Sequence, residues 1–277
     1  FEHLEFDRKE GWSKITNWDL KELKDLMSQW QYKLQQNNGW TSLYFCNHDQ
    51  PRIVSRYGDD CKYCKESAKM LGTMLHTLRG TPFIYQGEEI GMTNISFDSL
   101  TAFDDIETRG YIKAVQEKGE MSEEEILEIA NYRTRDNART PMHWNDSKYA
   151  GFSEVEPWLR MNKNYPEINV EKDLTANDSV FKYYQKLISL RKKYPVFAYG
   201  KYNILMEEDK NIYAYERLGE ENNLLVLLNF SKEKVNYKLD SEIKFEQAKL
   251  ILNNYQEEIK SELQGFLRPY EARVYIY

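Results

Sequence analysis

The hydrophobic pattern of the chain alternates between helical and strand-like segments. Apolar residues spaced by three and four predict an amphipathic helix that begins at a cap on Asn17. Further helices are predicted over about 62–79 and 178–193, and short buried strands over 41–46 and 82–86. Alternating helices and strands are typical of βα units with a parallel sheet. Because each strand ends in a polar cluster, a ligand site is expected at the carboxyl ends of the strands.

The pattern changes twice after the second strand. Residues 92–177 are predicted to form a long insertion with one helix, whose first turn carries Ser122 and Glu125 as a capping box. From Tyr199 onward, short alternating β-branched and aromatic runs predict an antiparallel β-sandwich. These runs are 212–215, 224–228, 235–239 and 273–276. We therefore expect an α/β region over 1–194 and a β domain over 195–277.

Composition narrows the class of protein. The net charge is −7 and the basic residues are scattered, which argues against a nucleic-acid partner. No apolar run approaches the roughly 20 residues that a membrane helix needs, so no membrane partner is expected. Three cysteines favour a reducing compartment and hence a cytoplasmic protein. Cys61 and Cys64 stand without a second pair at metal-ligand spacing, so a structural role is favoured and no metal site is expected.

The tetrad Asn47-His48-Asp49-Gln50, followed by Pro51 and Arg52, is the first candidate for chemistry. A carboxylate beside an imidazole at a strand end can bind sugar hydroxyls and stabilise an oxocarbenium-like transition state. Such a pair in a loop is more often only a structural hydrogen-bonded pair, so the tetrad alone does not establish a catalytic site. Glu88 and Glu89 also stand together, but adjacent residues on an extended backbone point to opposite sides. They are therefore expected to be scaffolding.

Four segments of the chain resemble motifs of the α-amylase superfamily. They are FCNHDQPR at 45–52, GTPFIYQGEEIGM at 80–92, RDNARTPM followed by Trp144 at 135–144, and LRPYEA at 267–272. They resemble the fourth conserved region, the eighth barrel strand, a signature of exo-acting α-glucosidases and the closing strand of the C-terminal domain, and they stand in the family's order. The resemblance implies the C-terminal portion of a (β/α)₈ barrel followed by an antiparallel β-sandwich. It makes 1–3 the end of the sixth strand, 41–46 the seventh and 82–86 the eighth.

The resemblance also implies roles for individual residues. The family uses a nucleophile after the fourth strand, a general acid/base after the fifth and a transition-state stabiliser after the seventh. Only the third has a match here, Asp49, with His48 contacting the same sugar. Arg135 matches an arginine of the −1 subsite and Glu107 a carboxylate near the +1 side, while Asn47 and Arg52 are further candidates for substrate binding. His3, Trp144 and Phe152 stay open between the sugar site and packing.

The chain begins at Phe1 rather than Met, so we expect the native N-terminus, the two bond-breaking carboxylates and any calcium site to lie upstream. The missing N-terminal part is then the partner of this chain, which is expected to be inactive alone. No cofactor is expected.

The implied activity is that of a retaining exo-acting α-glucosidase that removes glucose from short α-1,6-linked isomalto-oligosaccharides. Cys46 before Asn47 favours a trehalose-6-phosphate hydrolase instead, whereas 1–3 and 135–139 resemble oligo-1,6-glucosidases. Dextran glucosidases and sucrose isomerases are further alternatives. A catalytically dead superfamily member and a carbohydrate-binding fragment are the non-enzymatic ones. Retention of the residues assigned above argues against the dead member.

Overall fold

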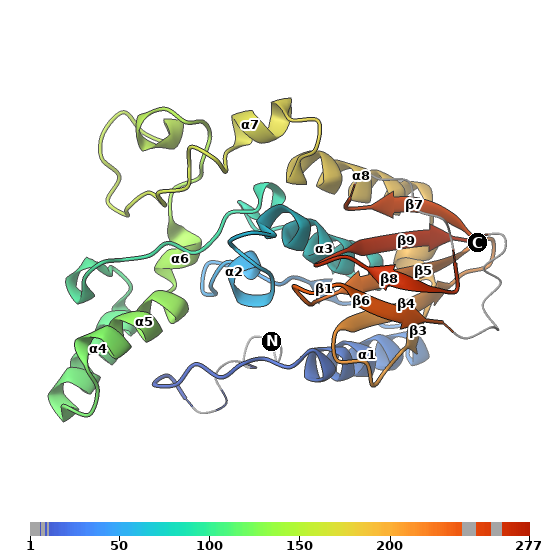
Figure 1. The fold of residues 1–277 in the computed structure, drawn as a ribbon, viewed down its shortest axis with the longest axis horizontal. Helices are drawn as coiled ribbons and strands as arrows, with labels where there is room; N and C mark the ends of the chain where they lie inside the picture. The colour runs from blue at the N-terminus through green and yellow to red at the C-terminus, as the bar shows by residue number, and fades with distance from the viewer. Residues whose placement is uncertain (1–5, 7–8, 10, 240–247, 256–261) are drawn as a thin grey trace. The chain divides into compact units, whose positions relative to one another are not determined.

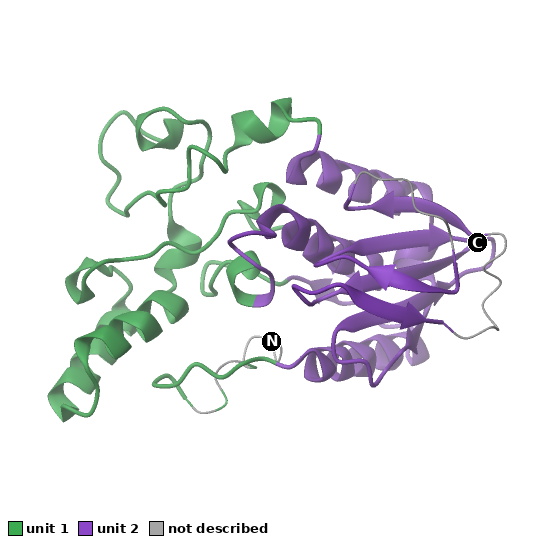
Figure 2. Cartoon of the chain, in the orientation of Figure 1, with its two compact units in different colours: residues 1–18, 45–56, 84–177 green, residues 19–44, 57–83, 178–277 purple. Residues whose placement is uncertain are grey.

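The computed structural model describes residues 6, 9, 11–239, 248–255 and 262–277. The chain forms two compact units, whose segments interleave along the sequence (Figure 2). The first comprises residues 1–18, 45–56 and 84–177, and the second comprises 19–44, 57–83 and 178–277. The end of a sixth strand, expected at residues 1–3, lies outside the described residues. The second unit combines the expected β domain with helices from earlier in the chain, and the boundary at residue 194 stays a prediction.

Helices α1 (Leu20–Gln36), α3 (Cys64–Thr77) and α8 (Val180–Lys193) of the second unit confirm the three helices predicted there. The short helix α9 (Val196–Tyr199) follows α8. The predicted cap of α1 was wrong, because Asp19 rather than Asn17 caps the helix. The Asp19 carboxylate accepts a hydrogen bond from the amide of Lys21 at 2.7 Å. An aspartate immediately before the first apolar position satisfies amide groups that the helix itself leaves unpaired.

Strand β1 (Ser42–Leu43) pairs in parallel with β2 (Thr81–Pro82), as a barrel requires. Both are shorter than the predicted segments. The amide of Thr81 donates to the Thr41 carbonyl at 2.8 Å, and that of Phe83 to the Leu43 carbonyl at 2.7 Å. Pro82 has no amide hydrogen to add to this ladder. Polar loops follow both strands, so the expected placement of candidate residues after strand ends is met.

The β domain consists of two antiparallel sheets. Five strands pair in the order β3-β4-β5-β9-β7, and β6 pairs with β8. Their bounds are β3 (Lys201–Leu205), β4 (Ile212–Leu218), β5 (Asn223–Asn229), β6 (Val235–Lys238), β7 (Lys249–Asn253), β8 (Gln264–Leu267) and β9 (Ala272–Ile276). Leu225 and Tyr275 of the larger sheet share one core with Tyr237 and Leu267 of the smaller, which makes the domain a sandwich.

The other face of the five-stranded sheet is covered by helices of the same unit (Figure 1). The Tyr215 hydroxyl shares a 2.5 Å hydrogen bond with Thr77 of α3, and Tyr202 shares one of 2.8 Å with Ser28 of α1. Both faces of β4 are therefore buried, although its aromatic and small residues alternate. The three-layer arrangement explains why residues 212–217 read as a nearly continuous buried run.

The first unit carries short helices joined by long loops. They are η2 (Glu88–Ile90), η3 (Leu100–Ala102), α4 (Ile106–Lys118), α5 (Glu123–Arg133), α6 (Asp136–Arg139), η4 (Lys148–Gly151) and α7 (Val170–Thr175), while α2 (Ile53–Tyr57) runs from the first unit into the second. The capping box of Ser122 and Glu125 is confirmed at the start of α5. Helix α4 was not predicted, and it packs Ile112 against Ile126 of α5. Within the described residues, no helix is long and apolar enough to cross a membrane.

Candidate active site

The loop after β1 presents His48 and Asp49. The side-chain oxygen of Asn47 accepts a hydrogen bond from the amide of Asp49 at 2.8 Å, and the amide of Gln50 donates to the Asn47 carbonyl at 3.3 Å. This turn is the kind that an Asn side chain stabilises. It follows that Asn47 uses its side-chain oxygen to shape the loop, which is a different task from the predicted contact with substrate.

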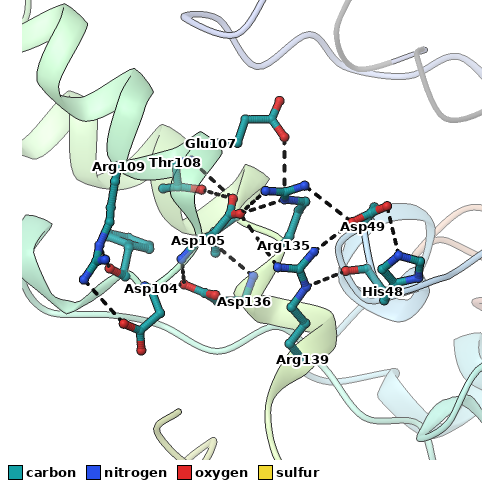
Figure 3. Close-up of polar contacts among 12 residues, drawn as sticks. His48, Asp49, Asp104, Asp105, Glu107, Thr108, Arg109, Arg135, Asp136 and Arg139 are labelled. Carbon is teal, nitrogen blue, oxygen red and sulfur yellow. Dashed lines mark hydrogen bonds and ion pairs between the residues drawn. The ribbon is translucent and has the colours of Figure 1, made fainter. Parts of the chain in front are cut away.

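The Asp49 carboxylate lies among three positively charged or ionisable groups (Figure 3). Its Oδ1 accepts from Nη2 of Arg139 at 2.8 Å and lies 3.6 Å from Nη1 of Arg135. Its Oδ2 is 3.2 Å from Nε2 of His48. The side chain is nevertheless 43% exposed, so it is both fixed and accessible. A preorganised, accessible carboxylate of this kind can accept hydrogen bonds from a bound sugar.

A buried carboxylate, Asp105, fixes Arg135. Asp105 Oδ1 accepts from Nε of Arg135 at 2.7 Å, and its side chain is fully buried. Its Oδ2 accepts from the amide of Thr108 at 3.2 Å and the Thr108 hydroxyl at 2.7 Å, which caps helix α4. Burial alone would raise the pKa of Asp105, but the hydrogen bonds from Arg135 and Thr108 outweigh it and hold this pKa below its usual value. The same contact raises the pKa of Arg135.

Glu107 completes the group at the first turn of α4. Its Oε2 lies 3.6 Å from Nε of Arg135, and its Oε1 accepts from the indole nitrogen of Trp12 at 3.1 Å. The side chain is 48% exposed. The structure therefore brings together His48, Asp49, Glu107 and Arg135, four residues that the sequence had placed in one site.

Two members of the group, Arg139 and Asp105, were missed by the sequence analysis. Arg139 was quoted only as part of a motif, yet it rather than Arg135 makes the short contact with Asp49 and also donates from Nε to the His48 carbonyl at 2.9 Å. Its position four residues after Arg135, on one helical face, was the available signal. For Asp105, the signal was its place three residues before Thr108, which is typical of a helix cap.

Asp136 joins the two helices that carry these residues. Its Oδ2 accepts from the amides of Asp104 and Asp105 at 2.8 and 3.1 Å. Asp136 lies in α6, between Arg135 and Arg139, so it ties α6 to the start of α4. The group of three carboxylates (Asp49, Asp105 and Glu107) and two guanidinium ions thus has a fixed geometry. Nowhere in the described part of the chain do three His, Cys, Asp or Glu side chains form a group that could hold a metal ion.

Arg52, predicted to bind substrate, is only 1% exposed. Its guanidinium donates to the carbonyls of Gln86 and Asn137 and to the Thr140 hydroxyl. These contacts favour a structural role for Arg52, in which it links segments of the unit, over direct contact with a sugar. Of the open candidates, Trp144 and Phe152 are each 49% exposed, and His3 lies outside the described residues.

The Glu88-Glu89 pair does not have the extended backbone expected for it. Both residues belong to the 3₁₀ helix η2, and Glu88 is 4% exposed. Glu88 Oε2 accepts from the amide of Tyr85 at 3.3 Å. Burial raises the pKa of Glu88 to about 8. The side chain is therefore neutral at pH 7 and has a place in the interior of the unit.

This raised pKa predicts a pH dependence of stability. Between the ordinary pKa of a glutamate and about 8, the unfolded chain loses the Glu88 proton and the folded chain keeps it. The stabilisation is thus complete below the unfolded pKa and is lost as pH rises toward 8, by roughly 1.4 kcal/mol per pH unit at most. Glu88→Gln keeps the acceptor for Tyr85 and removes the titration. We expect the Tm of the variant, relative to wild type, to rise from pH 5 to pH 8.

Thermal unfolding at pH 5, 6.5 and 8 measures this effect. Each kcal/mol shifts Tm by roughly 2–4 °C in a chain of this size. Glu117→Gln, on the exposed surface of α4, is the matched control and should show no such trend. An equal Tm difference between Glu88→Gln and wild type at all three pH values would contradict a neutral buried Glu88.

Comparisons with known proteins identify the family and the relatives of this chain. The alpha-amylase family, described as "Alpha amylase, catalytic domain", matches residues 1–200. The oligo-1,6-glucosidase of Parageobacillus thermoglucosidasius is 48% identical over an alignment 279 residues long, which covers 99% of this chain and 49% of the relative. The trehalose-6-phosphate hydrolase of Bacillus subtilis (strain 168) is 42% identical over 280 residues, with the same two coverages.

The crystal structure of Bacillus licheniformis trehalose-6-phosphate hydrolase superposes with a TM-score of 0.95 at 42% identity, covering 100% of this chain and 50% of that one. The chain therefore spans about half the length of the relatives it matches. The α/β fold of a partial barrel followed by a β domain is confirmed by this likeness. Because the catalytic-domain model of the alpha-amylase family matches most of the length of this chain, the chain belongs to the α-amylase family.

Proposed function

We propose that this chain is part of a retaining, exo-acting α-glucosidase that hydrolyses short α-1,6-linked oligosaccharides from the non-reducing end. The observation that carries the proposal is the Asp49 carboxylate, which Arg139 and His48 hold at the end of a barrel strand while almost half of it stays exposed. In the reaction, Asp49 accepts hydrogen bonds from the hydroxyls of the glucose whose bond is broken. These bonds strengthen as positive charge develops on the sugar ring.

The neighbouring residues support Asp49. His48 contacts the same glucose, and the hydrogen bond from Arg139 fixes the orientation of the Asp49 carboxylate. Arg135 is assigned to the −1 subsite, which holds that glucose, and Glu107 to the +1 side, nearer the leaving group. A retaining mechanism needs a nucleophile and a general acid/base about 5–5.5 Å apart. Asp49 and Glu107 are both ion-paired to Arg135, which supports binding roles for them, so the bond-breaking pair is assigned to the part of the relatives that this chain does not match.

The remaining expectations belong to the same proposal. Residues 1–194 supply the end of the catalytic barrel with its long insertion, and 195–277 the C-terminal β-sandwich. The partner of this chain is the N-terminal part of the same enzyme, and the substrate is an oligosaccharide. Three cysteines, an odd number in a chain of this length, support a cytoplasmic location.

A trehalose-6-phosphate hydrolase is the second candidate, favoured by the solved relative and by Cys46. The charges of the site argue for an unphosphorylated substrate instead. The three carboxylates and two guanidinium ions of the group together carry a net charge of −1. Both arginines are already paired with carboxylates, which argues against bidentate binding of a phosphate by either guanidinium.

Two chimeras separate these candidates. In each, residues 1–277 follow the unmatched half of a relative, either the Parageobacillus oligo-1,6-glucosidase or the Bacillus subtilis trehalose-6-phosphate hydrolase. Each chimera is assayed on the substrate of its parent, isomaltose or trehalose 6-phosphate, and compared with that parent. We expect the first chimera to keep the larger share of the parental kcat/KM. A larger share in the second chimera would assign this chain to the phosphorylated substrate.

A further inference from the structure

Three separate segments of the first unit meet at the guanidinium of Arg52. Its Nη1 donates to the carbonyl of Gln86 at 2.5 Å, and its Nε to the carbonyl of Asn137 at 3.1 Å. Its Nη2 lies 3.5 Å from the Thr140 hydroxyl, and the group also lies over the ring of Tyr85. Arg52 thus connects its own loop to the segment after β2 and to α6.

Two of these segments carry the candidate site. Asp49 lies three residues before Arg52, and Arg139 lies between Asn137 and Thr140. The 2.8 Å contact between Asp49 and Arg139 therefore bridges the same two segments that the buried guanidinium joins. The Tyr85 hydroxyl, which donates to the Ala138 carbonyl at 3.0 Å, supports α6 from the third segment.

We propose that Arg52 is a positioning residue, which holds Arg139 against Asp49 and His48 by fixing α6 to the loop after β1. The effect of this positioning on catalysis rests on the proposed function. The position of Arg139 itself can be tested in the chain alone. Arg52 contacts no reacting group, because it is almost completely buried.

The local sequence is adapted to a guanidinium at this place. Three acceptors lie in different directions, which suits a rigid planar fork and not the single ammonium of a lysine. Gly87 adopts a φ of +93°, and a Cβ atom there would lie 2.8 Å from Nη1 of Arg52. The backbone after β2 can therefore approach Arg52 closely only because residue 87 has no side chain.

The test is the exchange of arginine Nε protons with water, measured by NMR on the ¹⁵N-labelled full chain. Arg139 Nε donates to the His48 carbonyl across the two segments, whereas Arg135 Nε donates to Asp105. In Arg52→Lys we expect the Arg139 proton to exchange about tenfold faster, the change that follows from losing one hydrogen bond. The Arg135 proton should change far less. Arg135→Lys and Arg139→Lys assign the two signals.

Arg217→Lys is the matched control. Arg217 is also fully buried and donates to backbone carbonyls, those of Thr77, Phe197 and Gly200, but it lies in the second unit. It should lower Tm and leave Arg139 unchanged. If Arg52→Lys does not fold, Thr140→Val removes one of the three acceptors of Arg52, together with the 3.3 Å hydrogen bond of that hydroxyl to the Asn137 carbonyl, and should give a smaller acceleration at Arg139 alone. The proposal is overturned if the tested variant folds with unchanged Arg139 exchange, or if Arg217→Lys accelerates Arg139 equally.

Discussion

Asp49→Asn should lower the kcat for isomaltose by about 10²–10³, the usual loss when one preorganised electrostatic contact is removed. The assay uses the chimera with the Parageobacillus half. Asparagine keeps the shape of the side chain and removes its charge, so the change isolates the charge-assisted hydrogen bonds to the sugar. An interaction that strengthens toward the transition state affects kcat when it is lost, and not only KM.

Asp98→Asn provides the matched control for this substitution. Asp98 is 70% exposed and forms an ion pair with Lys163, so its loss should leave kcat within about twofold, as expected of exposed ion pairs. Circular dichroism establishes that each variant is folded. A correctly folded Asp49→Asn enzyme with kcat within a few-fold of wild type and a raised KM would make Asp49 an ordinary binding residue.

Residues 1–277 alone should not hydrolyse p-nitrophenyl α-glucoside above the uncatalysed rate. Retention requires two carboxylates across one bond, and the described carboxylates of the site are ion-paired with arginines, which supports binding roles for them. The measurement is release of p-nitrophenol by the purified chain, compared with buffer and with the chimera at equal concentration. The chimera should be active.

A trace of contaminating glucosidase is distinguished by substitution. Activity of the isolated chain that persists in Asp49→Asn and Glu107→Gln comes from a contaminant. Activity that disappears in either variant would show that this chain contains its own catalytic pair, contrary to the proposed division of the site.

Regular elements with strong local signals were predictable from the sequence. The spacing of apolar residues identified α1, α3 and α8, and the capping box located the start of α5, because both signals depend on neighbours within a few residues. Helix α4 was missed, since its sequence contains Gly110 and few apolar residues. Its start is marked by the Asp105 cap on Thr108, a single local signal that is weaker than the capping box of α5.

The site was predictable as a set of segments but not as a set of contacts. The position of His48 and Asp49 after a short strand could be read from the chain, and the motif containing Arg135 pointed to the right region. Which arginine reaches Asp49 depends on how α6 is placed, and that placement depends on the buried contacts of Arg52 and Asp136. Arg52 was assigned to substrate because a charged residue beside the tetrad gave no sign of its burial.

Trapping the covalent intermediate tests the central claim most directly. The chimera is incubated with 5-fluoro-α-glucosyl fluoride, which slows breakdown of the glucosyl-enzyme that a retaining mechanism forms. Peptide mass spectrometry then locates the labelled carboxylate. The account predicts one label, on a peptide from the half that precedes residue 1, and a slower rate of labelling in Asp49→Asn. A label on Asp49, Glu107 or any other carboxylate of residues 1–277 would contradict it.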